Sequence, residues 1–102
     1  MEVISLMYLT VHNQLTLLHD LLDEQTIYRT VSLNEYKQIR RLVKTICTNN
    51  NIDDQLLSIL PEIYNYGIKG ELSQSPLEHA MTNKKNIEKW LNTIHLAKTK
   101  IS

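Results

Sequence analysis

The spacing of the apolar residues constrains this chain more than any other feature of its sequence. Near the start they recur in steps of four and three residues, at Ile4, Tyr8, Val11, Leu15, Leu18 and Leu22. Such steps place side chains on one face of an α-helix, which turns once every ~3.6 residues. Only two glycines and two prolines interrupt the 102 residues, so long helices are permitted. The spacing therefore predicts an all-α protein.

Residues that favour a helix start divide the chain into four segments. The candidate caps are Ser5 or Thr10 for the first helix, Ser32 for the second, Asn51 or Asp53 for the third and Ser75 for the fourth. Ser32 and Ser75 are each followed three positions later by a glutamate, which is the capping-box pattern. The prediction is a single domain over residues 1–102, folded as a compact bundle of about four amphipathic helices.

Apolar stripes at helical spacing follow the later three starts. They comprise Tyr36, Ile39, Leu42, Val43 and Ile46; then Leu56, Leu57, Leu60, Ile63 and Tyr64; then Ala80, Ile87, Trp90, Ile94, Ala97 and Ile101. Pro61 interrupts the third stripe, and proline lacks the N–H that a helix interior needs, so this helix is predicted to be kinked or split near Pro61. "GIKG", residues 67–70, predicts the end of that helix and a turn. The alternative for "GIKG", a loop that clamps a nucleic-acid backbone, lacks a mixed α/β setting.

Composition and motifs argue against several classes of function. Eleven basic and eleven acidic residues cancel, whereas a dedicated nucleic-acid binder is usually basic. His12, His19, His79 and His95 lack metal-ligand spacing, "NNNIDD" lacks the glycine of a calcium loop, and no nucleophile elbow or phosphate loop is present. We therefore expect a protein that is not an enzyme and has no cofactor or metal.

The single cysteine and the missing membrane signals predict a location. Cys47 cannot form an internal disulfide, and it is expected to be buried and inert in an apolar helical run. The apolar N-terminus lacks the basic residues of a secretory signal, and no run approaches the ~20 apolar residues of a membrane span. These features predict a cytoplasmic protein without a membrane partner.

The second predicted helix carries a cluster of basic residues. Lys37, Arg40, Arg41 and Lys44 point roughly 140° away from its apolar stripe, at 100° per residue, so they form its outward face. A solvated surface explains such a face, and the alternatives are docking to an acidic protein or binding of phosphates. Four cations neutralise at most about four phosphates, which gives weak binding at physiological salt. We expect a protein partner, with nucleic-acid binding through this face as the alternative.

Three leucines of the first segment lie off its main stripe. They are Leu9, Leu17 and Leu21. Because a small bundle can leave them uncovered, we expect a homodimer through this face.

The chain resembles the YtzH-like proteins, a family of small, functionally uncharacterised bacterial proteins. The resemblance rests on "LTVHNQLTLLHDLLDEQ", "IRRLVKTI", "LLSILPEIYNYG" and "NIEKWLNTI", and it covers about residues 9–94. It implies a helical structure and transfers no activity or site residues. It also implies that residues 1–6 are an extension and that Met7 is an alternative start.

Overall fold

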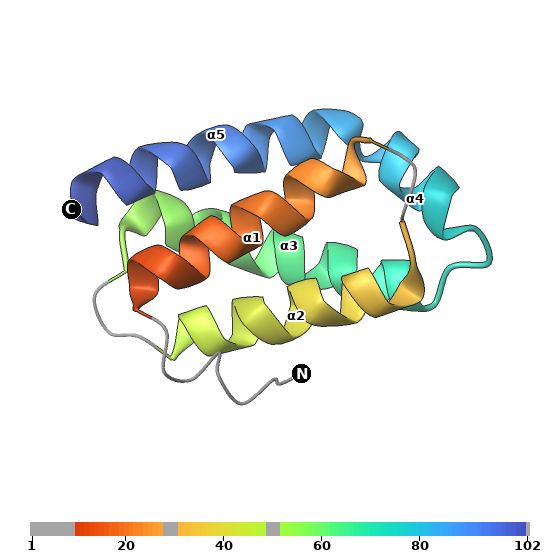
Figure 1. The fold of residues 1–102 in the computed structure, drawn as a ribbon, viewed down its shortest axis with the longest axis horizontal. Coiled ribbons are helices and arrows are strands. Elements are labelled where there is room, and N and C mark those ends of the chain that lie inside the picture. Colours follow the sequence, from red (N-terminus) through yellow and green to blue (C-terminus); the bar gives the residue numbers. More distant parts are fainter. Residues whose placement is uncertain (1–9, 28–30, 49–51, 102) are drawn as a thin grey trace.

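The computed structural model describes residues 10–27, 31–48 and 52–101, which form a helical bundle. The helices are α1 (Val11–Gln25), α2 (Leu33–Cys47), α3 (Asp54–Glu71), α4 (Pro76–Thr82) and α5 (Lys84–Ile101). The four long helices alternate in direction, and the short α4 lies at the end of the bundle where α3 leads into α5 (Figure 1). The described residues contain no strand, so the predicted all-α bundle is confirmed.

Side-chain caps start the first four helices. Thr10, Ser32, Asp53 and Ser75 accept hydrogen bonds from the backbone N–H of Asn13, Glu35, Gln55 and Glu78, at 3.0 to 3.3 Å. Each bond satisfies an N–H that has no partner within its helix. All four residues were predicted caps, and the rival candidates Ser5 and Asn51 lie outside the described residues.

The apolar stripes predicted from the sequence form the core. The buried members include Leu15, Leu18, Leu22, Tyr36, Ile39, Leu42, Val43, Ile46, Leu56, Leu60, Ile63, Ala80, Ile87, Trp90, Ile94 and Ala97. Leu57 departs from the prediction because its side chain is exposed, and Tyr64 is half-buried at the edge of the core. Ile4, Tyr8 and the side chain of Ile101 lie outside the described residues.

The last predicted helix is in fact two helices that meet at Asn83. The Asn83 side chain donates to the carbonyl oxygen of His79 at 2.8 Å, and its backbone N–H also bonds back into α4. Its own carbonyl oxygen accepts from the N–H of Ile87 at 2.9 Å and so begins α5. Asn83 therefore ends one helix and starts the next, which accounts for five helices where about four were expected.

Pro61 does not divide α3, which runs without a break from Asp54 to Glu71. Of the two predicted alternatives the split is therefore wrong, because Pro61 lies on the exposed side of the helix, and the kink stays a prediction. The missing N–H of Pro61 deprives the carbonyl oxygen of Leu57 of its bond. Leu57 is exposed too, so water can reach that oxygen and the cost is small.

Gly67 and Gly70 lie inside α3, and the prediction that "GIKG" ends the helix is also wrong. A Cβ added at Gly70 would lie 2.3 Å from the Tyr36 ring, and one added at Gly67 would lie 3.0 Å from the Tyr36 carbonyl oxygen. Both glycines face α2, which forms the most extensive helix pair of the bundle with α3. They serve here to let two helix backbones approach closely.

Tyr36 lies at the centre of a cluster that joins α2 to α3, α4 and α5. Its ring packs edge-on against Tyr66 and His79, and Tyr66 in turn contacts Trp90 edge-on. The Tyr36 hydroxyl donates to the carbonyl oxygen of Pro76 at 2.5 Å, and burial raises the pKa of Tyr36, so the donor proton is retained.

Gln25 connects α1 to the same cluster. It is fully buried, its amide nitrogen donates to Glu35 at 2.7 Å, and its amide oxygen accepts from the Tyr66 hydroxyl at 2.6 Å. The amide thereby satisfies its polar atoms away from water, which a buried group requires. All five helices are therefore tied to one set of side chains.

We expect Gly70→Ala to destabilise the fold, although alanine favours a helix over glycine by ~1 kcal/mol. The new methyl group would overlap the Tyr36 ring, and overpacking of this kind costs about 1 to 3 kcal/mol. Urea unfolding followed by circular dichroism measures the change. In a Tyr36→Ala background the overlap is absent, so Gly70→Ala should there be neutral or stabilising. A stabilising Gly70→Ala in the wild-type background would contradict the close packing of α2 on α3.

A candidate interaction surface on α2 and α3

The structure separates the four predicted basic residues into two groups. Arg40 is half-buried and turned toward α3, where its Nε and Nη2 donate to the two carboxylate oxygens of Glu71, at 2.5 and 3.4 Å. A planar guanidinium that engages both oxygens is fixed in position. Arg40 thus fastens α2 to the end of α3, and its guanidinium is already engaged within the chain.

The other three basic residues form a row along the outer side of α2. Lys37, Arg41 and Lys44 are spaced four and three positions apart, with Arg41 and Lys44 exposed and Lys37 half-buried. Arg40 holds the pKa of Glu71 below its usual range, and Lys37 and Arg41 add smaller contributions. The carboxylate of Glu71 is therefore ionised at neutral pH and offsets part of the charge near Lys37.

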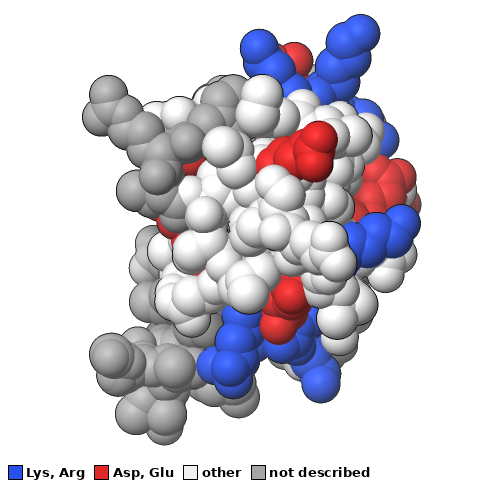
Figure 2. All heavy atoms as spheres, turned by 90° about the vertical axis from the view of Figure 1, so that its right-hand side faces the viewer, with Lys and Arg blue, Asp and Glu red and all other residues white. Residues whose placement is uncertain are grey.

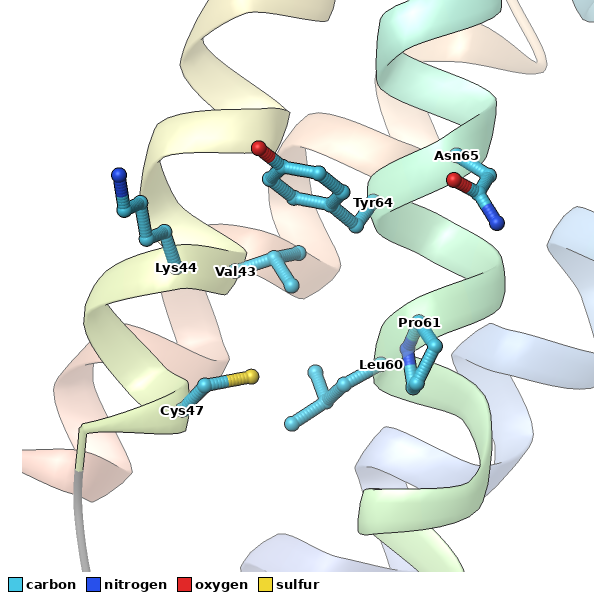
Figure 3. Close-up of a pocket in the computed structure, with 7 residues that line it drawn as sticks. All are labelled: Val43, Lys44, Cys47, Leu60, Pro61, Tyr64 and Asn65. Atoms are coloured by element: carbon cyan, nitrogen blue, oxygen red, sulfur yellow. The ribbon is translucent and has the colours of Figure 1, made fainter.

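Lys44 stands apart from that carboxylate, beside a groove between α2 and α3. Within the described ranges, neither Lys44 nor Arg41 forms an ion pair. The groove has a volume of about 320 Å³, and its walls are largely apolar. Figure 3 shows the residues that line it: Val43, Lys44 and Cys47 from α2, and Leu60, Pro61, Tyr64 and Asn65 from α3.

The lining residues give the groove an apolar floor and a polar rim. In Figure 3 the side chains of Val43 and Leu60 and the Cys47 sulfur point into the space between the helices, while Lys44 and Asn65 point away from it. The Tyr64 ring lies across the space, and its hydroxyl helps Glu71 to raise the pKa of Arg40. Tyr64 thus interacts with the Arg40 side chain as well as lining the groove.

Cys47 is exposed, contrary to the expectation of a buried and inert residue. It is the last residue of α2, so solvent reaches its side chain beside the groove. Partial burial nevertheless raises the pKa of the Cys47 thiol, so it is largely protonated at neutral pH.

The leucines predicted to form a dimer face have partners within the chain. Leu21 is buried, and Leu17 packs against the core from a half-buried position. Leu9 lies outside the described residues. Leu17 and Leu21 thus give no apolar face on α1 that needs a second chain.

The described residues contain no group of three or more histidine, cysteine, aspartate or glutamate side chains that could hold a metal ion. His79 stacks on Tyr66 and bonds to the Tyr66 carbonyl oxygen at 3.0 Å, so it belongs to the aromatic cluster of the core. None of the described helices combines the length and the apolar content needed to cross a membrane.

Sequence reasoning found the basic row and missed the groove. The groove depends on which side of α3 faces α2, and this register is set by Gly67 and Gly70, which had been assigned to a turn. Two glycines three positions apart are equally typical of a helix end, so no separate signal for the crossing was present in the sequence.

Comparison with known proteins places the chain among bacterial relatives. The family model described as "YtzH-like protein" matches residues 9–94. The chain is similar to a protein of Bacillus subtilis (strain 168) named "Uncharacterized protein YtzH", with 26% identity over 79 residues, which cover 78% of this chain and 86% of the relative. None of the solved structures matches the chain.

We expect Cys47 to take up one equivalent of N-ethylmaleimide in the folded protein, because its thiol is exposed. The reaction should be slower than in the urea-unfolded chain at the same pH, since the raised pKa lowers the fraction of thiolate. The rate should still increase as the pH passes 9.0, the ordinary pKa of this group. Mass spectrometry follows the uptake, with Cys47→Ser as the unreactive control. A folded chain that takes up no label would contradict the exposed position.

Proposed function

We propose that this chain, which belongs to the YtzH-like protein family, is a non-enzymatic protein–protein interaction module. Its partner presents an acidic segment with an apolar anchor. The anchor enters the groove between α2 and α3, and the acidic groups lie along Arg41 and Lys44. The observation that carries the proposal is an apolar groove with Lys44 at its edge, on a helix whose outer side also carries Arg41.

The groove suits side chains of a protein better than a whole small molecule. Its volume of about 320 Å³ is at the lower end of the ~300–1,000 Å³ that ligand pockets span, and it is open to solvent along one side. Burying apolar surface there contributes roughly 25 cal/mol per Å² removed from water. A partner that inserts a few apolar side chains therefore gains most of its affinity from the groove.

The basic row selects the charge of that partner. Arg41 and Lys44 are exposed, so each pairing adds only ~0.2 to 1 kcal/mol and is screened by salt. Their larger effect is on orientation and on the rate of encounter with an acidic segment. The apolar anchor and the acidic groups of the partner thus both contribute to binding, and the contribution of each can be tested separately.

The chemistry of the groove supports binding rather than catalysis. Cys47, its one thiol, is largely protonated at neutral pH. Nucleophilic catalysis needs a base beside the thiol, and the lining residues include no histidine, aspartate or glutamate.

Nucleic-acid binding through α2 is the weaker candidate. The Arg40 guanidinium is held by Glu71, so three basic side chains remain, and the Glu71 carboxylate lies among them. About three phosphate contacts leave little affinity at physiological salt. The favoured partner is therefore a protein.

Selection of short random peptides displayed on phage against the folded chain tests the proposal. Enriched peptides should combine aspartate or glutamate with a leucine, isoleucine or phenylalanine, because the surface is basic beside an apolar groove. Fluorescence anisotropy with the synthetic peptides then measures affinity. Alkylating Cys47 with N-ethylmaleimide fills the groove and should weaken binding by about tenfold or more.

Two controls separate the contributions of the groove and the charge. Lys44→Glu should weaken binding several-fold, and Lys85→Glu, which reverses an exposed lysine on α5, should leave it unchanged. Cys47→Ser treated with the same reagent should keep its affinity. Peptides that bind the alkylated protein with the same affinity as the unmodified protein would refute the groove as the binding site. Tight binding of duplex DNA at ~150 mM salt would instead favour the nucleic-acid alternative.

A further inference from the structure

One end of the bundle concentrates exposed apolar side chains. Seven large hydrophobic side chains are exposed in the described part of the chain, and five of them come from segments at this end: Ile27, Leu33, Leu72, Leu77 and Met81. They belong to the end of α1, the start of α2, the end of α3 and α4, which lie together at the right of Figure 1. We call these five residues the apolar end.

The short helix α4 turns its larger apolar side chains outward. Ala80 is its buried residue, whereas Leu77 and Met81, four positions apart and so on one face, are exposed. Leu72, the C-cap of α3, is the most exposed of the five at 79%. The end of the bundle thus shows leucine and methionine where a fully solvated helix would carry polar residues.

The charges around the apolar end indicate which kind of partner can bind there. Among the described residues, Figure 2 shows this face with a largely uncharged middle and with both acidic and basic side chains along its upper, right and lower margins. A margin of mixed sign attracts neither an anionic membrane nor a polyanion. Two copies of such a face do not repel each other, whereas two copies of the basic row on α2 would.

We infer that the apolar end is the interface of a symmetric homodimer. In a two-fold contact the same patch meets itself, so Leu77 and Met81 of one chain cover the corresponding surface of its copy. The two shorter dimensions of the whole molecule are 29 and 20 Å, so a contact confined to one end is small beside the ~800 Å² that each partner buries in a standard interface. A contact of this size belongs with weak, transient interfaces, so we expect a reversible dimer.

This interface is separate from the groove proposed for partner binding. The groove is lined by the C-terminal part of α2 and the middle of α3, and none of its lining residues belongs to the apolar end. Dimerisation leaves both grooves open, and the two proposals can fail independently.

Sedimentation velocity from ~5 to ~300 µM tests the inference. The wild-type chain should shift from the mass of one chain toward twice that mass as concentration rises. Leu72→Asp with Met81→Asp should remain monomeric throughout, and its circular dichroism should match the wild type because both side chains are exposed. Alkylation of Cys47 should leave the equilibrium between monomer and dimer unchanged.

Two further exposed leucines in the described part of the chain supply a matched control. Leu57 on α3 and Leu96 on α5 are 46% and 45% exposed and lie elsewhere on the bundle. Leu57→Asp with Leu96→Asp should dimerise like the wild type. A wild type that is monomeric at ~300 µM overturns the inference, and so does a dimer that the control pair disrupts as strongly as the test pair.

Discussion

The close approach of α2 to α3 at two glycines is the contact on which the rest of the molecule depends. With Gly70 beneath the Tyr36 ring, the ring occupies space that any side chain at position 70 would fill. From there Tyr36 reaches Pro76 through its hydroxyl and Tyr66 and His79 through its ring. Wider spacing of the two helices would break these contacts together, and it would also change the width of the groove.

Each polar contact between the helices adds little to the stability of the bundle. Their main effect is to select one arrangement of the helices. The buried Gln25 amide fits Glu35 and Tyr66 in one geometry only, since each of its polar atoms needs its own partner. The Arg40–Glu71 pair does the same on the outer side of α2 and α3. Together they hold the register in which Val43 and Leu60 face a common space and Lys44 lies beside it.

The sequence predicted the helices and their caps because both are local properties. Thr10, Ser32 and Ser75 bond within their own first turns, and Trp90 lies on a stripe that repeats at helical spacing. Long-range packing decided one of the features that were missed. In the sequence alone, Gly67 and Gly70 are typical of a helix end. Their packing against Tyr36 of α2 shows that they instead mark the place where α2 and α3 cross. The split at Asn83 rests on local bonds to His79 and Ile87, and it was missed because one apolar stripe continues through α4 and α5. Cys47 is exposed because it is the last residue of α2.

Native-state hydrogen exchange on the intact chain tests most directly whether the α2–α3 contact organises the fold. If it does, the backbone amides of Ile39 to Val43 and of Ile63 to Gly67 exchange only through global unfolding, with free energies equal to that from urea denaturation. The amides of α4, which is seven residues long, open at lower free energy. Amides in the middle of α2 or α3 that exchange before those of α1 and α5 would contradict the account.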